Sequence, residues 1–323
     1  MAYTIWTNGV FSPSATRLLK DGTSGHTLVT ASVSHASVLA AGNSDPALAS
    51  ADIAFGQPDA SDCLNSPQLK WVEVTSAGYT RYDTTEFFDA FRKRNAVFTN
   101  ASGVFADPCA QHILAMMLAF ARQILPSHRD QLTDRSWHYD ERRANSRLIS
   151  GQTVLLLGFG AIGRRLAQLL APFGVKLLAF RRQSTAPEGV ELVAEANLPA
   201  ALARADHVVN ILPETPFTLH FINAERLAHI QPSARFYNVG RGSTVDQSAL
   251  ANALFSGKLC AAFLDVTSPE PLPPDHPLWT TPNCYITPHT AGGRHDQDEA
   301  VVRHFLRNLK AFEKGESLED RVL

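Results

Sequence analysis

The sequence has few of the features that mark secreted, metal-binding or membrane proteins. Its 323 residues include only four cysteines, Cys63, Cys109, Cys260 and Cys284, which lie far apart and form no CxxC pair. This spacing excludes a dense disulfide scaffold, and the His and Cys residues lack the spacing of a zinc site. The N-terminus has no basic and then apolar signal pattern, so we expect a reduced, cytoplasmic protein without a bound metal.

Excess charge and long apolar runs are absent too. The formal net charge of -2 argues against a broad nucleic-acid-binding surface. No uninterrupted apolar run reaches the roughly 18 residues that span a bilayer, so no membrane partner is expected. At 323 residues the chain exceeds what one hydrophobic core usually supports, which predicts two domains.

A glycine-rich turn organises residues 153–182. Apolar residues 154–157 lead into Gly158-Phe159-Gly160-Ala161-Ile162-Gly163, after which the apolar period becomes helical, and residues 175–180 form a second apolar run. This order predicts a strand, a turn, a helix and a strand. In such a unit the glycines permit a tight turn, the approach of a pyrophosphate and close helix packing, while helix amides face the phosphate. We therefore expect these six residues to bind a dinucleotide.

The end of the second run indicates which dinucleotide binds. An acidic residue normally stands there and accepts hydrogen bonds from the adenosine ribose. This chain instead has Arg181 and Arg182, whose guanidinium groups bind phosphate well. The alternative is two solvated surface arginines. We expect NADP(H) to be favoured, with NAD(H) possible.

The first hundred residues predict an α/β unit of their own. Five short apolar runs, at 3–6, 27–31, 53–55, 69–74 and 96–99, alternate with polar segments and predict strands with helices between them. The loop Thr75-Ser76-Ala77-Gly78-Tyr79 directly follows the fourth run. Successive amides around a glycine form a nest that suits a substrate carboxylate, although a plain strand-ending turn is an equal alternative.

The chain between the two apolar-rich halves has a distinct character. Residues 106–124 are apolar around most of a helical circumference, which predicts a helix buried on several sides. Residues 126–150 are polar with charges of both signs and are expected to form a solvated connection. Trp137 and Tyr139 within it would suit an arm that lies on a partner subunit.

After the glycine turn, strands and helices alternate in a pattern that predicts a doubly wound parallel sheet of the Rossmann type. Strands are expected at 207–212, 235–239, 260–266 and 284–287, and a closing helix at 298–314 is expected to pack on the N-terminal domain. His295 and His304, near or on that helix, are expected to be solvated surface residues.

Ligands of such sheets lie beyond the carboxyl ends of the strands. The residues expected at these ends are Gly158, Pro213, Arg241, Asp265 and His289, with Glu270 on the following proline-rich loop. Arg241 would bind the carboxylate of a 2-oxo acid and polarise its carbonyl. His289 would donate a proton to the oxygen, and Glu270 would orient the imidazole and stabilise its charged form. Each residue alone also has a structural explanation.

Five ordered motifs make the chain resemble the D-isomer-specific 2-hydroxyacid dehydrogenases. They are GFGAIG at 158–163, LPETPFT at 212–218, NVGRG at 238–242, LDVTSPEPLP at 264–273 and ITPHTAGG at 286–293. The resemblance implies that Arg241, Glu270 and His289 are catalytic and that Asp265 binds the nicotinamide carboxamide. It further implies cofactor contacts at Pro213, Thr218 and Val239, and substrate contacts at Ser76, Ala77 and Gly78 as well as Arg241 and His289.

The resemblance also implies the domain layout. Residues 1–103 and 291–323 would form a discontinuous, flavodoxin-like substrate-binding domain, and residues 104–290 an NADP-binding Rossmann domain. Homodimerisation would use the helix and arm at 106–150.

Within the family, the chain is most similar to the short NADP-dependent glyoxylate and hydroxypyruvate reductases. One departure affects the substrate loop, where Gly78-Tyr79-Thr80 replaces the common Gly-aliphatic-Asp. The expected activity is hydride transfer between NADP(H) and a small 2-oxo or D-2-hydroxy acid. The alternatives are an enzyme like phosphoglycerate or phosphite dehydrogenase, and a nucleotide-sensing corepressor that binds protein partners.

Overall fold

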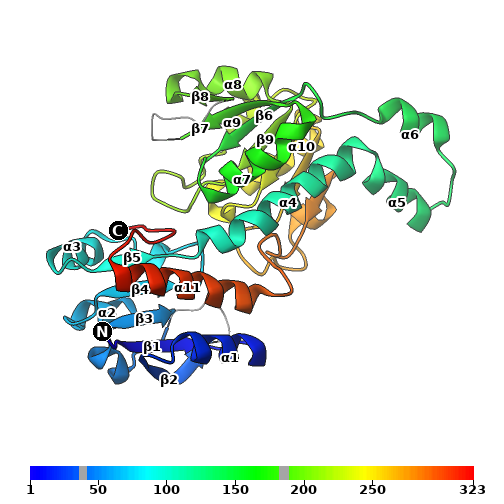
Figure 1. Ribbon diagram of the computed structural model, residues 1–323. Helices are drawn as coiled ribbons and strands as arrows, with labels where there is room; N and C mark the ends of the chain where they lie inside the picture. Colours follow the sequence, from blue (N-terminus) through cyan, green and yellow to red (C-terminus); the bar gives the residue numbers. More distant parts are fainter. Residues whose placement is uncertain (36–41, 182–188) are drawn as a thin grey trace. The chain divides into compact units, whose positions relative to one another are not determined.

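The computed structural model describes residues 1–35, 42–181 and 189–323 (Figure 1). The chain divides into two compact units. Unit 1 comprises Met1–Phe105 and Arg294–Leu323, and unit 2 comprises Ala106–Gly293. The boundaries expected from the sequence, after residues 103 and 290, lie within three residues of these.

Unit 1 is built on a five-stranded parallel sheet in the order β2-β1-β3-β4-β5, which is the flavodoxin-like order. Every strand overlaps one of the apolar runs from which it was predicted. The strands are β1 (Thr4–Gly9), β2 (Thr27–His35), β3 (Ile53–Gly56), β4 (Trp71–Val74) and β5 (Val97–Thr99).

The described part of unit 1 wholly contains the α-helices α1 (Pro13–Gly22), α2 (Ala60–Asn65), α3 (Thr85–Lys93) and α11 (Gln297–Lys314). Helix α11 packs on the sheet of this unit, as the sequence predicted for the closing helix. Its Phe305 ring stacks on Phe55 at 4.1 Å and on Trp71 at 5.2 Å between ring centroids. Aromatic stacking therefore ties the last helix to strands formed by the start of the chain.

The prediction that His304 is a surface residue is wrong. This histidine on α11 is 1% exposed and its Nδ1 lies 3.0 Å from Oε1 of Glu73, which is fully buried on β4. Its Nε2 lies 3.1 Å from Asp320 Oδ2, as an ion pair rather than a well-aligned hydrogen bond. Asn308 and Thr99 also donate to Glu73. The helix face that carries His304 meets the buried carboxylate of Glu73, a fact that the spacing of apolar residues does not reveal.

Charge around His304 predicts a loss of stability at alkaline pH. Burial alone would lower the pKa of His304, but Asp320 and Glu73 outweigh burial and raise this pKa from 6.5 to about 9. The protonated ring therefore stabilises the fold fully below pH 6.5, and this contribution is lost as the pH rises through 9. At about 1.4 kcal/mol per pKa unit, the free energy of unfolding should fall by about 3 kcal/mol across this range.

The measurement is urea denaturation between pH 6 and pH 10 of the wild type, His304→Gln and His295→Gln. His304→Gln should lower the free energy of unfolding at pH 7 by about 3 to 5 kcal/mol, since it leaves a buried carboxylate without its cation. It should also flatten the alkaline decline. His295 is exposed, so the same substitution there should change neither property. An equal decline in all three proteins would contradict the assignment.

Unit 2 is built on a seven-stranded parallel sheet in the order β12-β11-β10-β9-β6-β7-β8. Numbered along the chain, the six strands β6 to β11 follow the Rossmann order. Strand β12 extends the sheet beside β11. The strands are β6 (Thr153–Leu157), β7 (Lys176–Phe180), β8 (Val190–Val193), β9 (His207–Asn210), β10 (Arg235–Asn238), β11 (Ala261–Leu264) and β12 (Cys284–Ile286). The sequence did not predict β8, because this edge strand buries only Val193.

Helices cover the sheet of unit 2. They are α7 (Ala161–Leu170), α8 (Leu198–Arg204), α9 (Ala224–His229) and α10 (Gln247–Phe255), together with most of α4 (Ser102–Ala121). Helix α4 ends three residues earlier than predicted, and Gln123 just beyond it has a left-handed φ of 57°. By length and composition α4 could cross a membrane. Its Ile113 and Met117, however, pack on sheet residues such as Leu156, as in the core helix of a globular domain.

The solvated connection expected at 126–150 contains two helices, α5 (Ile124–Leu132) and α6 (Tyr139–Asn145). Figure 1 shows this arm projecting away from the sheet of unit 2. Arg142 of α6 donates to both carboxylate oxygens of Asp130 on α5, at 2.8 and 2.9 Å. The mixed charges that predicted only a solvated segment thus join the two helices to each other.

Candidate active site

The glycine turn between β6 and α7 has the geometry that its sequence predicts. Gly158 has a φ of 98°, and a Cβ there would lie 3.2 Å from the Ile211 carbonyl oxygen. A Cβ on Gly163 would lie 3.0 Å from the Gly158 carbonyl oxygen, so this glycine permits close packing of helix and turn. A Cβ on Gly160 would meet nothing within 4 Å, which leaves room for a ligand beside the start of α7.

The remaining residues of the turn divide their roles. Phe159 is buried in the core beside α4, so only its backbone is available to a ligand. Ala161 and Ile162 form the first turn of α7, and no side chain caps this helix end. Uncapped amides next to an open glycine suit a pyrophosphate. The residues present therefore fit a dinucleotide.

Arg181 directly follows β7, the strand beside β6, and is half-buried. This is the position at which the adenosine end of a dinucleotide is expected. Arg182, the second arginine of the prediction, lies outside the described residues.

The other predicted residues follow successive strands of the sheet. Pro213 lies in the loop after β9, Arg241 after β10, Asp265 directly after β11 and His289 after β12. Because all these strands are parallel neighbours, the structure brings the four residues to one edge of unit 2. Val239, next to β10, is partly buried at the same edge.

Thr218 has a role within its own loop. Its buried hydroxyl donates to the Pro213 carbonyl at 2.6 Å and accepts from the Thr215 amide at 2.8 Å. This side chain thus closes the loop after β9 and shapes the surface that Pro213 presents.

Glu270 and His289 form a pair. The His289 Nδ1 lies 2.7 Å from Glu270 Oε2, and Glu270 Oε1 accepts from the Thr267 amide at 2.9 Å. The His289 backbone amide donates to the Asp265 carbonyl at 2.8 Å. With Nδ1 directed at a carboxylate, the ring presents Nε2 to a ligand. A carboxylate-oriented imidazole of this kind can transfer a proton.

Comparison with known proteins places this geometry in a family. Residues 114–291 match the D-isomer specific 2-hydroxyacid dehydrogenase, NAD binding domain. The chain belongs to the D-2-hydroxyacid dehydrogenase family. The glyoxylate reductase of Korarchaeum cryptofilum is 32% identical over 264 residues, which cover 78% of this chain and 75% of that protein.

Two solved structures of the family match nearly the whole chain. A D-isomer specific 2-hydroxyacid dehydrogenase from Xanthobacter autotrophicus Py2, in complex with NADPH and MES, is 28% identical with a TM-score of 0.80 and covers 100% of this chain and 98% of its own. The NADPH-dependent glyoxylate/hydroxypyruvate reductase of Sinorhizobium meliloti, in complex with NADP and sulfate, is 26% identical with a TM-score of 0.78. The match covers 99% of this chain and 98% of that reductase.

In this family member Asp265 has a role that sequence reasoning missed. Its carboxylate is 5% exposed and accepts from the Thr287 hydroxyl at 2.6 Å, the Thr290 amide at 2.8 Å and the Ala291 amide at 3.0 Å. All three donors lie on the segment that carries His289. Asp265 therefore holds this segment in place, with Thr287 as an unpredicted partner. The sequence signal for this contact is weak, because it consists of an acid and a threonine, Asp265 and Thr287, that follow adjacent strands.

The candidate substrate loop belongs to unit 1. Asn100 donates to the Ala77 carbonyl at 2.9 Å, and the Ala101 amide donates to the Ser76 carbonyl at 3.0 Å. Gln57, which is buried, donates to the Ser76 hydroxyl at 3.2 Å. Among the described residues, the amides of Ser76, Ala77 and Gly78 have no acceptor. Asn100 and Gln57 were not predicted, because they follow other strands of the sheet.

The pair of Glu270 and His289 predicts that catalysis depends on the carboxylate that orients the imidazole. Glu270→Gln removes the negative charge beside the imidazole while keeping the size of the side chain. In reduction assays kcat should fall about 10- to 100-fold, which steady-state rates measure. Glu225→Gln, an exposed change on α9, is the matched control, and an unchanged kcat in Glu270→Gln would argue against the pair.

Proposed function

We propose that this protein reduces a small 2-oxo acid to the D-2-hydroxy acid with NADPH, with glyoxylate or hydroxypyruvate as the favoured substrate. The observation that carries the proposal is the pair of Glu270 and His289, 2.7 Å apart, at the same sheet edge as Arg241 and the glycine turn. A proton donor, a fixed cation and a dinucleotide turn are the groups that carbonyl reduction requires.

Each side chain would perform one part of the reduction. The Arg241 guanidinium binds the substrate carboxylate and polarises the adjacent carbonyl. Protonated His289 gives its Nε2 proton to the carbonyl oxygen, and Glu270 stabilises the ring while it is charged. In unit 1, the amides of Ser76, Ala77 and Gly78 are candidate donors to a carboxylate. A bound nicotinamide cofactor supplies the hydride that the carbonyl carbon accepts.

The chain's own residues support NADP(H) as the cofactor. Gly158, Gly160 and Gly163 would hold the pyrophosphate, and Asp265 and Val239 lie at the edge where the nicotinamide would bind. Arg181 takes the place of the acidic residue that would repel a 2'-phosphate. Two family members that match this chain were solved with NADPH or NADP, which agrees with this choice.

Arg181→Asp should reverse the cofactor preference. A carboxylate there would repel the 2'-phosphate and accept hydrogen bonds from the ribose of NADH. We expect the ratio of kcat/KM for NADPH to that for NADH to fall about 100-fold or more. Arg303→Asp makes the same charge change at an exposed position on α11 of unit 1 and should leave the ratio unchanged. An unchanged ratio in Arg181→Asp would exclude this role.

The activity itself is tested by mixing the purified protein with NADPH and a panel of glyoxylate, hydroxypyruvate, pyruvate and phosphohydroxypyruvate. Loss of absorbance at the reduced nicotinamide band reports turnover. Preference for glyoxylate or hydroxypyruvate is the expected result. Preference for phosphohydroxypyruvate would favour a phosphoglycerate dehydrogenase. Binding of NADPH without turnover of any acid would favour a nucleotide-sensing corepressor.

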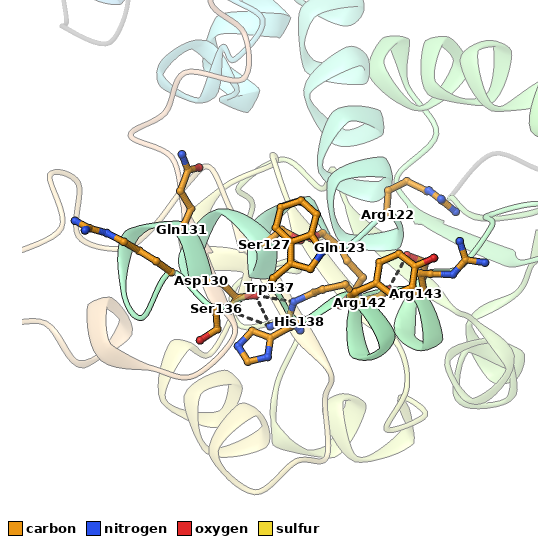
Figure 2. A pocket seen from close by; sticks show the side chains of 13 residues that line it. Arg122, Gln123, Ser127, Asp130, Gln131, Ser136, Trp137, His138, Arg142 and Arg143 are labelled. Carbon is orange, nitrogen blue, oxygen red and sulfur yellow. Dashed lines mark hydrogen bonds and ion pairs between the residues drawn. The ribbon is translucent and has the colours of Figure 1, made fainter.

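We also propose that the arm of α5 and α6 forms a homodimer. A hollow of about 800 Å³ lies between these helices, and Figure 2 shows the Trp137 indole among the side chains that line it. Trp137 is 90% exposed, and Tyr139, Leu132 and Leu148 of the same arm are also exposed. Such aromatic anchors suit a partner subunit. Light scattering after gel filtration should give the mass of a dimer, and a monomer at micromolar concentration would exclude the proposal.

A reducing, cytoplasmic location is part of the proposal. All four cysteines are unpaired, and burial raises the pKa of the Cys109 thiol to about 12. Thiols with a raised pKa react slowly with oxidants. Detection of the protein in a secreted fraction would contradict this location.

A further inference from the structure

Three buried polar side chains converge on the backbone around Arg241. They are Asn210 at the end of β9, Asn238 at the end of β10 and Thr244 in the 3-10 helix Gly242–Thr244, and each is at most 1% exposed. Asn238 begins the NVGRG motif, but the proposed mechanism gives no role to any of these three side chains. Buried amides and hydroxyls are costly unless their hydrogen bonds are satisfied, so their bonding pattern indicates what they hold.

Most of their hydrogen bonds hold the loop that carries Arg241. The Arg241 carbonyl accepts from the Thr244 hydroxyl at 2.6 Å and from the Asn238 amide group at 3.1 Å. Asn238 Oδ1 also accepts from the Gly240 amide at 3.1 Å. Asn210 Nδ2 donates to Thr244 Oγ1 at 2.7 Å and to Asn238 Oδ1 at 3.0 Å. The amide group of Asn210 thus orients Asn238 and Thr244, the two side chains that bind the Arg241 carbonyl.

The glycines beside Arg241 restrict the same loop. A Cβ on Gly240 would lie 2.6 Å from the Leu212 carbonyl oxygen, and one on Gly242 would lie 1.9 Å from the Thr267 carbonyl oxygen. The backbone on either side of Arg241 therefore touches the loops after β9 and β11. Gly240 and Gly242 pack against neighbouring loops, and buried side chains bind the Arg241 carbonyl. Together these contacts fix the direction in which the Arg241 side chain leaves the backbone.

We propose that Asn210, Asn238 and Thr244 are positioning residues that act through Arg241 on the binding of the 2-oxo acid. The inference rests on the role proposed above for Arg241. A long, flexible side chain loses less freedom on binding when its backbone is already fixed. The three side chains would therefore affect binding of the acid and catalysis, and leave cofactor binding unchanged.

Thr244→Val and Thr244→Ser form a matched pair for the test. Valine keeps the shape of threonine and removes the hydroxyl that donates to the Arg241 carbonyl, whereas serine keeps that hydroxyl. In Thr244→Val, kcat/KM for the 2-oxo acid should fall about 10- to 100-fold, while the Kd of NADPH from fluorescence titration stays within about twofold. Thr244→Ser should recover most of the loss. If Thr244→Val does not fold, Thr244→Ala serves in its place.

A double-mutant cycle separates this role from a purely structural one. In an Arg241→Lys background, Thr244→Val should have less than about a twofold further effect, because the group through which it acts is already changed. The proposal would be overturned if the kcat/KM losses of Thr244→Val and Arg241→Lys multiplied fully in the double variant. It would also be overturned if Thr244→Val weakened NADPH binding as much as it lowered kcat/KM for the acid.

Hydrogen exchange gives a result that does not need turnover. Thr244→Val should speed exchange in the peptide over residues 238–244 about tenfold, and Thr244→Ser should restore it. Unchanged exchange would overturn the proposal. If no 2-oxo acid is reduced by the wild type, the proposed function fails, and the exchange data still decide whether the three residues hold this loop.

Discussion

Backbone contact between neighbouring strand-end loops is the constraint on which the candidate site depends. Gly240 faces the Leu212 carbonyl and Gly242 the Thr267 carbonyl too closely for a side chain, and Gly158, with a φ of 98°, lies against the Ile211 carbonyl. Three points of contact thus link the loops after β6, β9, β10 and β11. Since the strands are parallel neighbours, these contacts convert the regular spacing of a sheet into fixed positions for residues that are far apart in sequence.

Buried polar side chains also hold the strand-end loops in place, in addition to the glycine contacts. Asp265 holds the segment of His289, and Asn210, Asn238 and Thr244 hold the loop of Arg241. Buried polar groups stabilise a fold only when every bond is made, so a displaced loop would leave several of them without partners. The cost of that loss favours one conformation of each loop. These bonds therefore hold the backbone of the site in one arrangement.

The parts of the structure that were predictable depend on residues close in sequence. Apolar periodicity and the glycine turn predicted both sheets and placed Arg241, Asp265 and His289 at strand ends, because a parallel sheet sends all its strand ends to one edge. Strand β8 has too little buried surface to produce a pattern. The contact of His304 with Glu73 joins residues 231 positions apart. Such pairs depend on how elements pack, which no local pattern records.

Two of the histidine and carboxylate pairs among the described residues differ in exposure, which explains why they suit different roles. His289 and Glu270 have side chains about one third exposed, so the ring can exchange its proton with a ligand. His304 and Glu73 have side chains that are 1% and 0% exposed, and Asp320 adds a second carboxylate. Burial alone would lower the pKa of His304, but the two anions outweigh burial and raise this pKa to about 9, so the ring keeps its proton near neutral pH. The same two residue types thus form the proposed proton donor where solvent reaches them, and a buried cation with its anions where it does not.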